Sequence, residues 1–169
     1  MHRAGRSGFA LVEALVALLV VALGAAGAGL LHVRALRTAR EAAYLSTAVQ
    51  VATALAARMA ANRVVLDGAD GANPYLHADG SAGRCYAAAC TPAELAAFDL
   101  AEARLEAAAR LPGGRILACR DLASPDPVTG LPPWSCADGP GAPLVVKLGW
   151  RTSRAANAPL LVLPVGAGR

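Results

Sequence analysis

The sequence predicts an α+β protein, in which one long N-terminal helix precedes a small C-terminal head of one or two helices and an antiparallel β-sheet. Three observations support this prediction. Residues 14–31 form a stretch of eighteen residues without a charge. No proline occurs before Pro74, so a helix can continue well beyond that stretch. Three runs rich in aliphatic residues, separated by proline, glycine and aspartate, occur in the last third of the chain.

Residues 9–31 are apolar enough for a helix that crosses a membrane. The uncharged stretch of eighteen residues is close to the lower limit for spanning a bilayer. Glu13 interrupts the beginning of the apolar run. A carboxylate in a membrane helix costs about 2.5–3.5 kcal/mol on insertion scales. A simple signal anchor would avoid this cost, so the glutamate indicates a function of its own.

A short basic segment, residues 1–8, precedes the apolar run and contains His2, Arg3 and Arg6. The apolar run is longer than the core of a secretory signal peptide. Cleavage between Gly8 and Phe9 would remove the basic segment and leave a new α-amino group on Phe9. Glu13 lies four residues further along, on the same face of a helix. Its carboxylate can then pair with the free N-terminus of a neighbouring, identically oriented helix.

The order Gly8-Phe9, Leu11, Glu13 and then an apolar run resembles the class III leader of type IV prepilins and of type II secretion pseudopilins. The resemblance implies that a membrane-embedded prepilin peptidase cuts after Gly8 and that Phe9 becomes N-methylated. It implies that Glu13 sets the register of each subunit in the filament. It further implies a type IV pilin-like fold and a single-pass inner-membrane protein with a periplasmic head, which enters the pilus after assembly.

The helix is expected to continue beyond the membrane to about residue 62, because the sequence becomes amphipathic from His32. The expected apolar positions are Leu45, Ala48, Ala52, Leu55 and Met59. The glycine-rich segment 24–29 is a candidate for local bending or melting, since glycine costs about 1 kcal/mol in a helix interior. The expected organisation is a leader (1–8), a membrane and filament-core segment (9–31), an amphipathic continuation (32–66) and a head (67–169).

A second helix is predicted in the head, beginning after Thr91. Thr91 is the expected N-cap, Pro92 the first helical residue and Glu94 the partner in a capping box. Its expected apolar stripe is Leu95, Phe98, Ala101, Leu105 and Ala108. The acidic residues of this helix are expected to be solvated: Glu94, Asp99, Glu102 and Glu106.

The pattern then changes to strands at residues 115–119, 143–151 and 159–165. Trp150 alternates with Leu148 and Val146 in the second of these runs, so we expect it to pack on the core. A long proline-rich loop separates the first two runs.

The four cysteines are expected to form disulfides, because an even number behind an export segment indicates an oxidising compartment. A zinc site is the alternative. The sixteen residues between Cys119 and Cys136 are too many for a paired-ligand knuckle, and His77 has no partner at ligand spacing. Three pairings are possible. Cys85 with Cys90 and Cys119 with Cys136 is favoured, because proline or turn residues bound both loops.

Looser motifs extend the resemblance past the leader. "RMAANR" at 58–63, the later "NPY", the capped helix and the closing "VVKLGWR" are similar to the PilV-type minor pilins, the type IV pilus modification proteins. This similarity implies a minor pilin that helps to initiate or prime pilus assembly. The implied partners are the inner membrane, the prepilin peptidase and other minor and major pilins. The alternatives are a minor pseudopilin of type II secretion, or a pilin whose head binds DNA or a surface receptor.

Nothing in the sequence indicates catalysis, so no enzymatic activity, cofactor or metal is expected. The histidines are His2, His32 and His77, and the sequence contains no nucleophile elbow, phosphate-binding loop or metal-spaced histidine pair. The net charge is +4, the arginines are dispersed and aromatic residues make up 4% of the chain. Without a basic stripe and stacking aromatics, no nucleic-acid partner is expected.

Overall fold

The computed structural model describes residues 7–77, 85–152 and 158–166, with residues 7–10 described by their backbone alone. The chain divides into two compact units, Met1–Ala42 and Ala43–Arg169, and each is described by itself.

The first unit contains most of helix α1, which extends over Ser7–Ala61. The helix is unbroken through the glycine-rich segment 24–29, because the flanking leucine and alanine residues favour the helix. Bending or melting of this segment is therefore not seen in the structure. Every side chain described between residues 11 and 42 is exposed, so this part of α1 has no packed face of its own.

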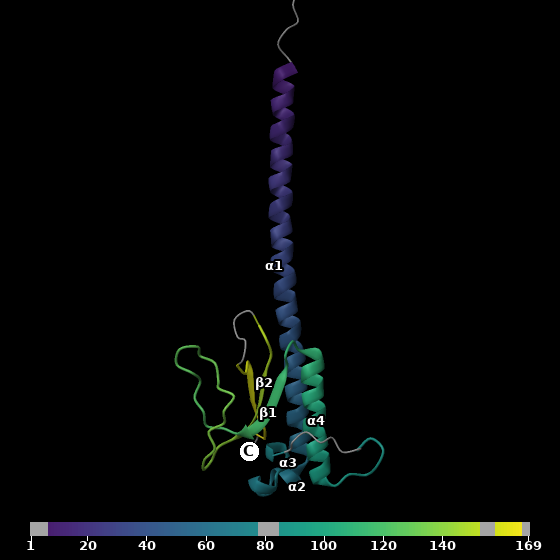
Figure 1. Ribbon diagram of the computed structural model, residues 1–169, viewed down its shortest axis with the longest axis vertical. Coiled ribbons are helices and arrows are strands. Elements are labelled where there is room, and N and C mark those ends of the chain that lie inside the picture. Colours follow the sequence, from purple (N-terminus) through teal and green to yellow (C-terminus); the bar gives the residue numbers. More distant parts are fainter. Residues whose placement is uncertain (1–6, 78–84, 153–157, 167–169) are drawn as a thin grey trace, which may run out of the picture. The chain divides into compact units, whose positions relative to one another are not determined.

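The second unit is the α+β head, which confirms the predicted fold class (Figure 1). After α1 it contains α2 (Arg63–Leu66), a 3₁₀ turn η1 (Asp70–Ala72), α3 (Pro74–His77), α4 (Pro92–Arg110), β1 (Arg115–Arg120), β2 (Leu144–Gly149) and β3 (Leu161–Pro164). The three strands form one antiparallel sheet in the order β1-β2-β3. Two of the expected strands are shorter than the sequence suggested, because proline and glycine bound them.

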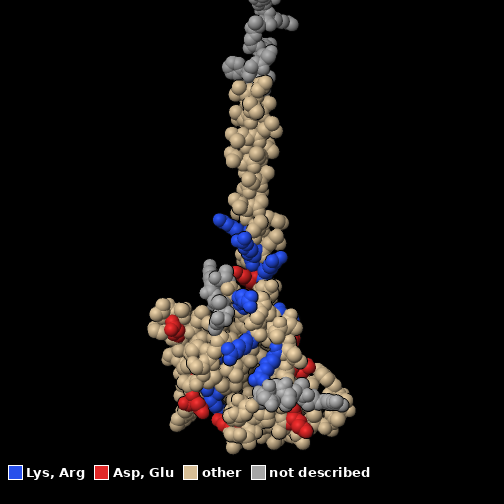
Figure 2. All heavy atoms as spheres, in the orientation of Figure 1, with Lys and Arg blue, Asp and Glu red and all other residues tan. Residues whose placement is uncertain are grey.

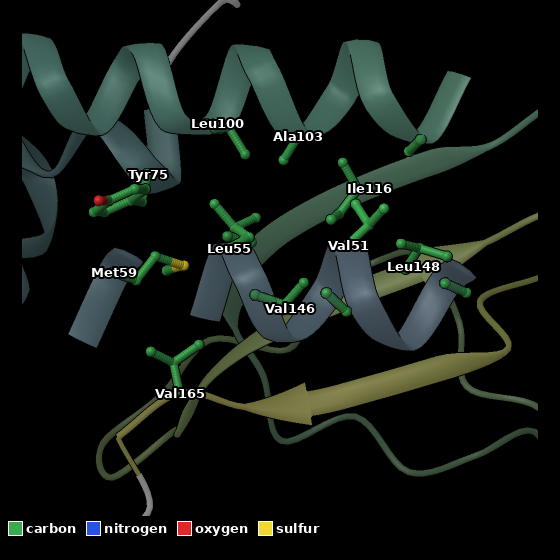
Figure 3. Close-up of a cluster of buried hydrophobic side chains, with 14 of the residues drawn as sticks. Val51, Leu55, Met59, Tyr75, Leu100, Ala103, Ile116, Val146, Leu148 and Val165 are labelled. Carbon is green, nitrogen blue, oxygen red and sulfur yellow. The ribbon is translucent and has the colours of Figure 1, made fainter. Parts of the chain in front are cut away.

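The C-terminal turns of α1 contribute to the core of the head (Figure 3). Val51 and Leu55 cluster with Leu100 of α4 and with Val146 and Leu148 of β2. Of the expected apolar positions on α1, four are buried: Ala48, Ala52, Leu55 and Met59. The prediction for Leu45 was wrong, since that side chain is 49% exposed. Trp150 is buried, as expected.

The capping box at the start of α4 is confirmed. The Thr91 hydroxyl accepts from the Glu94 backbone N–H, and the Glu94 carboxylate accepts from the Thr91 backbone N–H at 2.8 Å. Hydrogen bonds from Thr91 lower the pKa of Glu94.

The predicted apolar stripe of α4 was largely wrong. Leu95 and Leu105 are exposed, at 40% and 63%. Ala108 is exposed too, whereas Phe98 and Ala101 are buried. The helix turns a different line toward the core cluster: Ala96, Leu100, Ala103 and Ala107. This line is mostly alanine, and its small side chains allow α4 to approach the alanines of α1 closely. The predicted stripe was based on larger apolar residues and therefore did not include this line.

Candidate functional site

The N-terminal motif lies at the beginning of α1. The backbone of Gly8, Phe9 and Glu13 is helical. The side chain of Phe9 lies outside the described part of the structure, as do residues 1–6 of the expected leader. The side chain of Glu13 is exposed. Phe9 and Glu13 are four residues apart, which places them about 6 Å apart along the helix axis and on one face.

The surface that follows this motif is apolar all around the helix. Between Leu11 and Leu31 the large apolar side chains are 53–68% exposed. Among the described residues, one helix, Leu11–Ala61, is long and apolar enough to cross a membrane, judged by its length and composition. A helix that is hydrophobic on every side suits lipid or the interior of an assembly better than water.

Comparison with protein families identifies the N-terminal motif. Residues 3–29 match a family model described as the prokaryotic N-terminal methylation motif. The match supports a type IV pilin or pseudopilin. It contains Gly8, Phe9 and Glu13, and it confirms the expectation of a prepilin-type leader motif. A search of curated proteins and a search of solved structures found no match to the chain.

The four cysteines are joined in two pairs in the head. Cys85 bonds to Cys90, with their Cα atoms 5.5 Å apart. Cys119 bonds to Cys136, with their Cα atoms 6.4 Å apart. The first bond closes a loop just before α4, and the second ties the end of β1 to the loop between β1 and β2. In this arrangement all four sulfur atoms are used in covalent bonds, so none is a thiolate ligand for zinc.

A buried ion pair, which was not predicted from the sequence, holds the same loop. Lys147 Nζ lies 2.7 Å from Asp121 Oδ2. Lys147 also donates to the backbone carbonyl oxygens of Pro133 and Ser135, at 2.8 and 3.0 Å. Burial opposes ionisation of Asp121, but hydrogen bonds from Lys147 and from two backbone N–H groups outweigh it and lower its pKa. The available signal was the position of the chain's only lysine, in the middle of an apolar strand.

A second polar cluster lies between α1, α3 and α4. The Tyr75 hydroxyl donates to Asp99 Oδ2 at 3.2 Å, and Arg58 Nη1 lies 3.5 Å from Asp99 Oδ1. The expectation that Asp99 is solvated was wrong, since this residue is 6% exposed. Burial raises the pKa of Asp99, although Tyr75 and Arg58 act in the opposite direction. Burial also raises the pKa of Tyr75, which keeps the phenol protonated as a donor.

Two further contacts attach peripheral segments to the core. Arg120 of β1 makes a forked pair of hydrogen bonds to Asp70 of η1, each at 3.0 Å. The ring of Tyr86 meets Phe98 edge to face at a centroid distance of 4.8 Å, and its hydroxyl donates to Glu102 at 2.7 Å. These contacts connect η1 to β1 and the segment before α4 to α4 itself.

Proposed function

We propose that this chain is a minor type IV pilin of the PilV type, which helps to initiate or prime pilus assembly. The observation that carries the proposal is the N-terminal methylation motif at residues 3–29, which overlaps a helix with apolar surface on every side. The disulfide-linked α+β head agrees with a role outside the cytoplasm, where disulfides persist.

In this proposal the prepilin peptidase cuts between Gly8 and Phe9 and the new N-terminus of Phe9 is methylated. The leader is residues 1–8, the membrane and filament-core segment is 9–31, the amphipathic continuation is 32–66 and the head is 67–169. Helix α1 is unbroken across the boundary between residues 31 and 32. The segments on the two sides of this boundary therefore differ in their surroundings more than in their backbone structure.

Glu13 has the role of fixing axial register between neighbouring helices. Leucine and valine contacts specify register poorly, because apolar helices slide along one another with little change in buried area. A carboxylate that pairs with the α-amino group of Phe9 on a neighbour favours one position strongly, since charges attract more strongly in a low dielectric. Removing the carboxylate therefore leaves insertion intact and impairs assembly.

The proposed location is the inner membrane, with the head in the periplasm, and the pilus after assembly. Counting arginines does not fix this orientation, because Arg3 and Arg6 precede the apolar segment while Arg34, Arg37 and Arg40 follow it. The orientation rests on recognition of the leader by the peptidase and on the two disulfides of the head. Other minor and major pilins are the proposed partners in the filament.

The test is complementation of a strain that lacks this subunit with a Glu13→Leu variant. We expect a processed, stably inserted protein on an immunoblot, together with loss of surface pili and of twitching motility. Glu41→Leu is the matched control, because Glu41 is the other carboxylate of α1. Normal piliation with Glu13→Leu at native expression would contradict the register role.

A Gly8→Val variant should remain uncut, and intact mass spectrometry of the native chain should give a mature form that begins at Phe9.

The matched motif is shared by pilins and pseudopilins, so the same strain distinguishes the second candidate. If the deletion strain makes normal pili and loses type II secretion, the chain is a minor pseudopilin instead.

A further inference from the structure

Three exposed arginines follow the apolar part of α1 within the first unit: Arg34, Arg37 and Arg40, here called the arginine strip. Figure 2 shows basic side chains gathered where the long uncharged stretch of the helix ends. Within the described part of the chain, the guanidinium groups of the strip form no ion pair. Glu41 is the only carboxylate between residues 14 and 66, so the strip carries a net positive charge.

The spacing of the strip places its charges on one side of the helix. Its members follow one another at intervals of three residues, which corresponds to steps of about 60° around the axis. The three side chains therefore lie within an arc of about 120°, with axial steps of about 4.5 Å. A single surface with several negative charges can contact all three at once.

The depth of the strip matches the headgroup layer of a bilayer, if residues 9–31 span the membrane as proposed above. Arg34 is three residues beyond Leu31, or about 4.5 Å along the axis, and Arg40 is about 14 Å beyond it. Each headgroup layer is about 5–8 Å thick. Helical side chains point back toward the N-terminus, and long arginine side chains extend further in that direction. The guanidinium groups therefore reach the layer that holds lipid phosphates.

We propose that the arginine strip binds the headgroups of anionic phospholipids such as phosphatidylglycerol, in the leaflet on the C-terminal side of the span. Guanidinium groups form forked, charge-assisted hydrogen bonds with phosphate. A phosphatidylcholine headgroup offers the same phosphate, but its own cation cancels the charge. Basic residues beside a span consequently favour lipids with net negative charge.

This binding also sets the depth of Glu13. Arg34 and Glu13 are 21 residues apart, or about 31 Å along a straight helix, which is close to the thickness of the hydrocarbon core of about 30 Å. With Arg34 held at one headgroup layer, Glu13 lies near the opposite edge of the hydrocarbon. Its carboxylate is then close to water before assembly, which reduces the cost of keeping a charge there.

The test is native mass spectrometry of the full chain, released from detergent micelles that contain either phosphatidylglycerol or phosphatidylcholine. The native chain should retain phosphatidylglycerol in preference. In a variant with Arg34→Gln, Arg37→Gln and Arg40→Gln, the ratio of retained phosphatidylglycerol to retained phosphatidylcholine should fall by at least about twofold. The corresponding lysine variant should fall between the two, since it keeps the charge and loses the forked geometry. The matched control removes the same charge from exposed arginines of the second unit, with Arg63→Gln, Arg110→Gln and Arg151→Gln, and should keep the native preference.

Equal retention of the two lipids by the native chain would overturn the proposal. So would an unchanged preference in the glutamine variant, or an equal loss in the head control. A glutamine variant that loses self-association while its lipid preference stays unchanged would assign the strip to a second copy of the chain instead. Circular dichroism of each variant checks that the helix is intact. Failure here would leave the complementation result with Glu13→Leu unaffected, so this inference and the proposed function can fail separately.

Discussion

Lys147 and Asp121 form an ion pair in the interior of the head, with Nζ and Oδ2 at 2.7 Å and side chains that are 0% and 5% exposed. The second carboxylate oxygen of Asp121 accepts the backbone N–H groups of Ala123 and Ala137, at 2.9 and 2.8 Å. One lysine on β2 and one aspartate after β1 thus connect the beginning of the loop between these strands to residues 133–137 further along it.

Replacing Lys147 by methionine should destabilise the head by about 3–5 kcal/mol, because it leaves the Asp121 carboxylate buried without its counter-charge. Adding Asp121→Asn should restore part of the loss, since the amide keeps an acceptor for the two backbone N–H groups and has no charge. The measurement is denaturant unfolding of the full chain in detergent, followed by the fluorescence of Trp134 and Trp150. Glu106→Gln is the control, as its pair with Arg110 is exposed and should contribute less than about 1 kcal/mol. Equal losses for the two single variants would refute the special cost of the buried pair.

The Asp99→Asn variant should change how stability depends on pH. Burial raises the pKa of Asp99 in the folded state, so the folded protein holds this proton more tightly than the unfolded chain does. Asp99 therefore lowers stability as the pH rises from about 4, its unfolded pKa, through its folded pKa. The unfolding free energy of the variant should therefore increase relative to that of the native protein as the pH is raised from 4 to 7. A constant difference between the two proteins across this range would rule out the raised pKa.

All four cysteines should be oxidised in protein isolated from the envelope. Alkylation of the denatured chain, followed by mass spectrometry, should find no free thiol and should link Cys85 to Cys90 and Cys119 to Cys136. Replacing both Cys119 and Cys136 by serine should cost about 3 kcal/mol in the chain-entropy account, because that bond joins residues separated by 17 positions. The same change at Cys85 and Cys90, separated by 5, should cost about 2 kcal/mol. Four free thiols, or stoichiometric zinc, would show that the disulfides are absent.

A Gly149→Ala substitution should destabilise the head by about 1–3 kcal/mol through overpacking. A Cβ atom at this position would lie 2.5 Å from the carbonyl oxygen of Ala158 and 2.9 Å from the ring of Trp134. Gly71→Ala is the control, because a Cβ atom there would meet nothing within 4 Å. Thermal unfolding of the two variants should separate them, and equal melting temperatures would show that the strand end has room to move.

The elements that were predictable from the sequence are those with local signals. The capping box at Thr91 and Glu94 and the uncharged run 14–31 each depend on residues close together in the chain. The leader motif is local in the same way. Strand positions followed from aliphatic runs between prolines and glycines.

The features that were missed depend on residues distant in sequence. Lys147 and Asp121 are joined only when β1 and β2 pair, and nothing near Asp121 identifies its partner. Asp99 is buried because Tyr75 and Arg58 come from two other helices. On α4, alanine fits both the exposed and the buried face, so periodicity alone could not choose between the two registers.

The burial of Val51, Leu55 and Met59 on α1 has a mechanical consequence for a chain held at its N-terminus. The apolar segment and these core residues belong to one unbroken helix. A tensile load on the anchor enters the hydrophobic interior directly, where close packing transmits strain. Withdrawing the helix from the head would break the contacts that these side chains make with the core cluster. The side chains that form the core of the head therefore also attach the head to its N-terminal anchor.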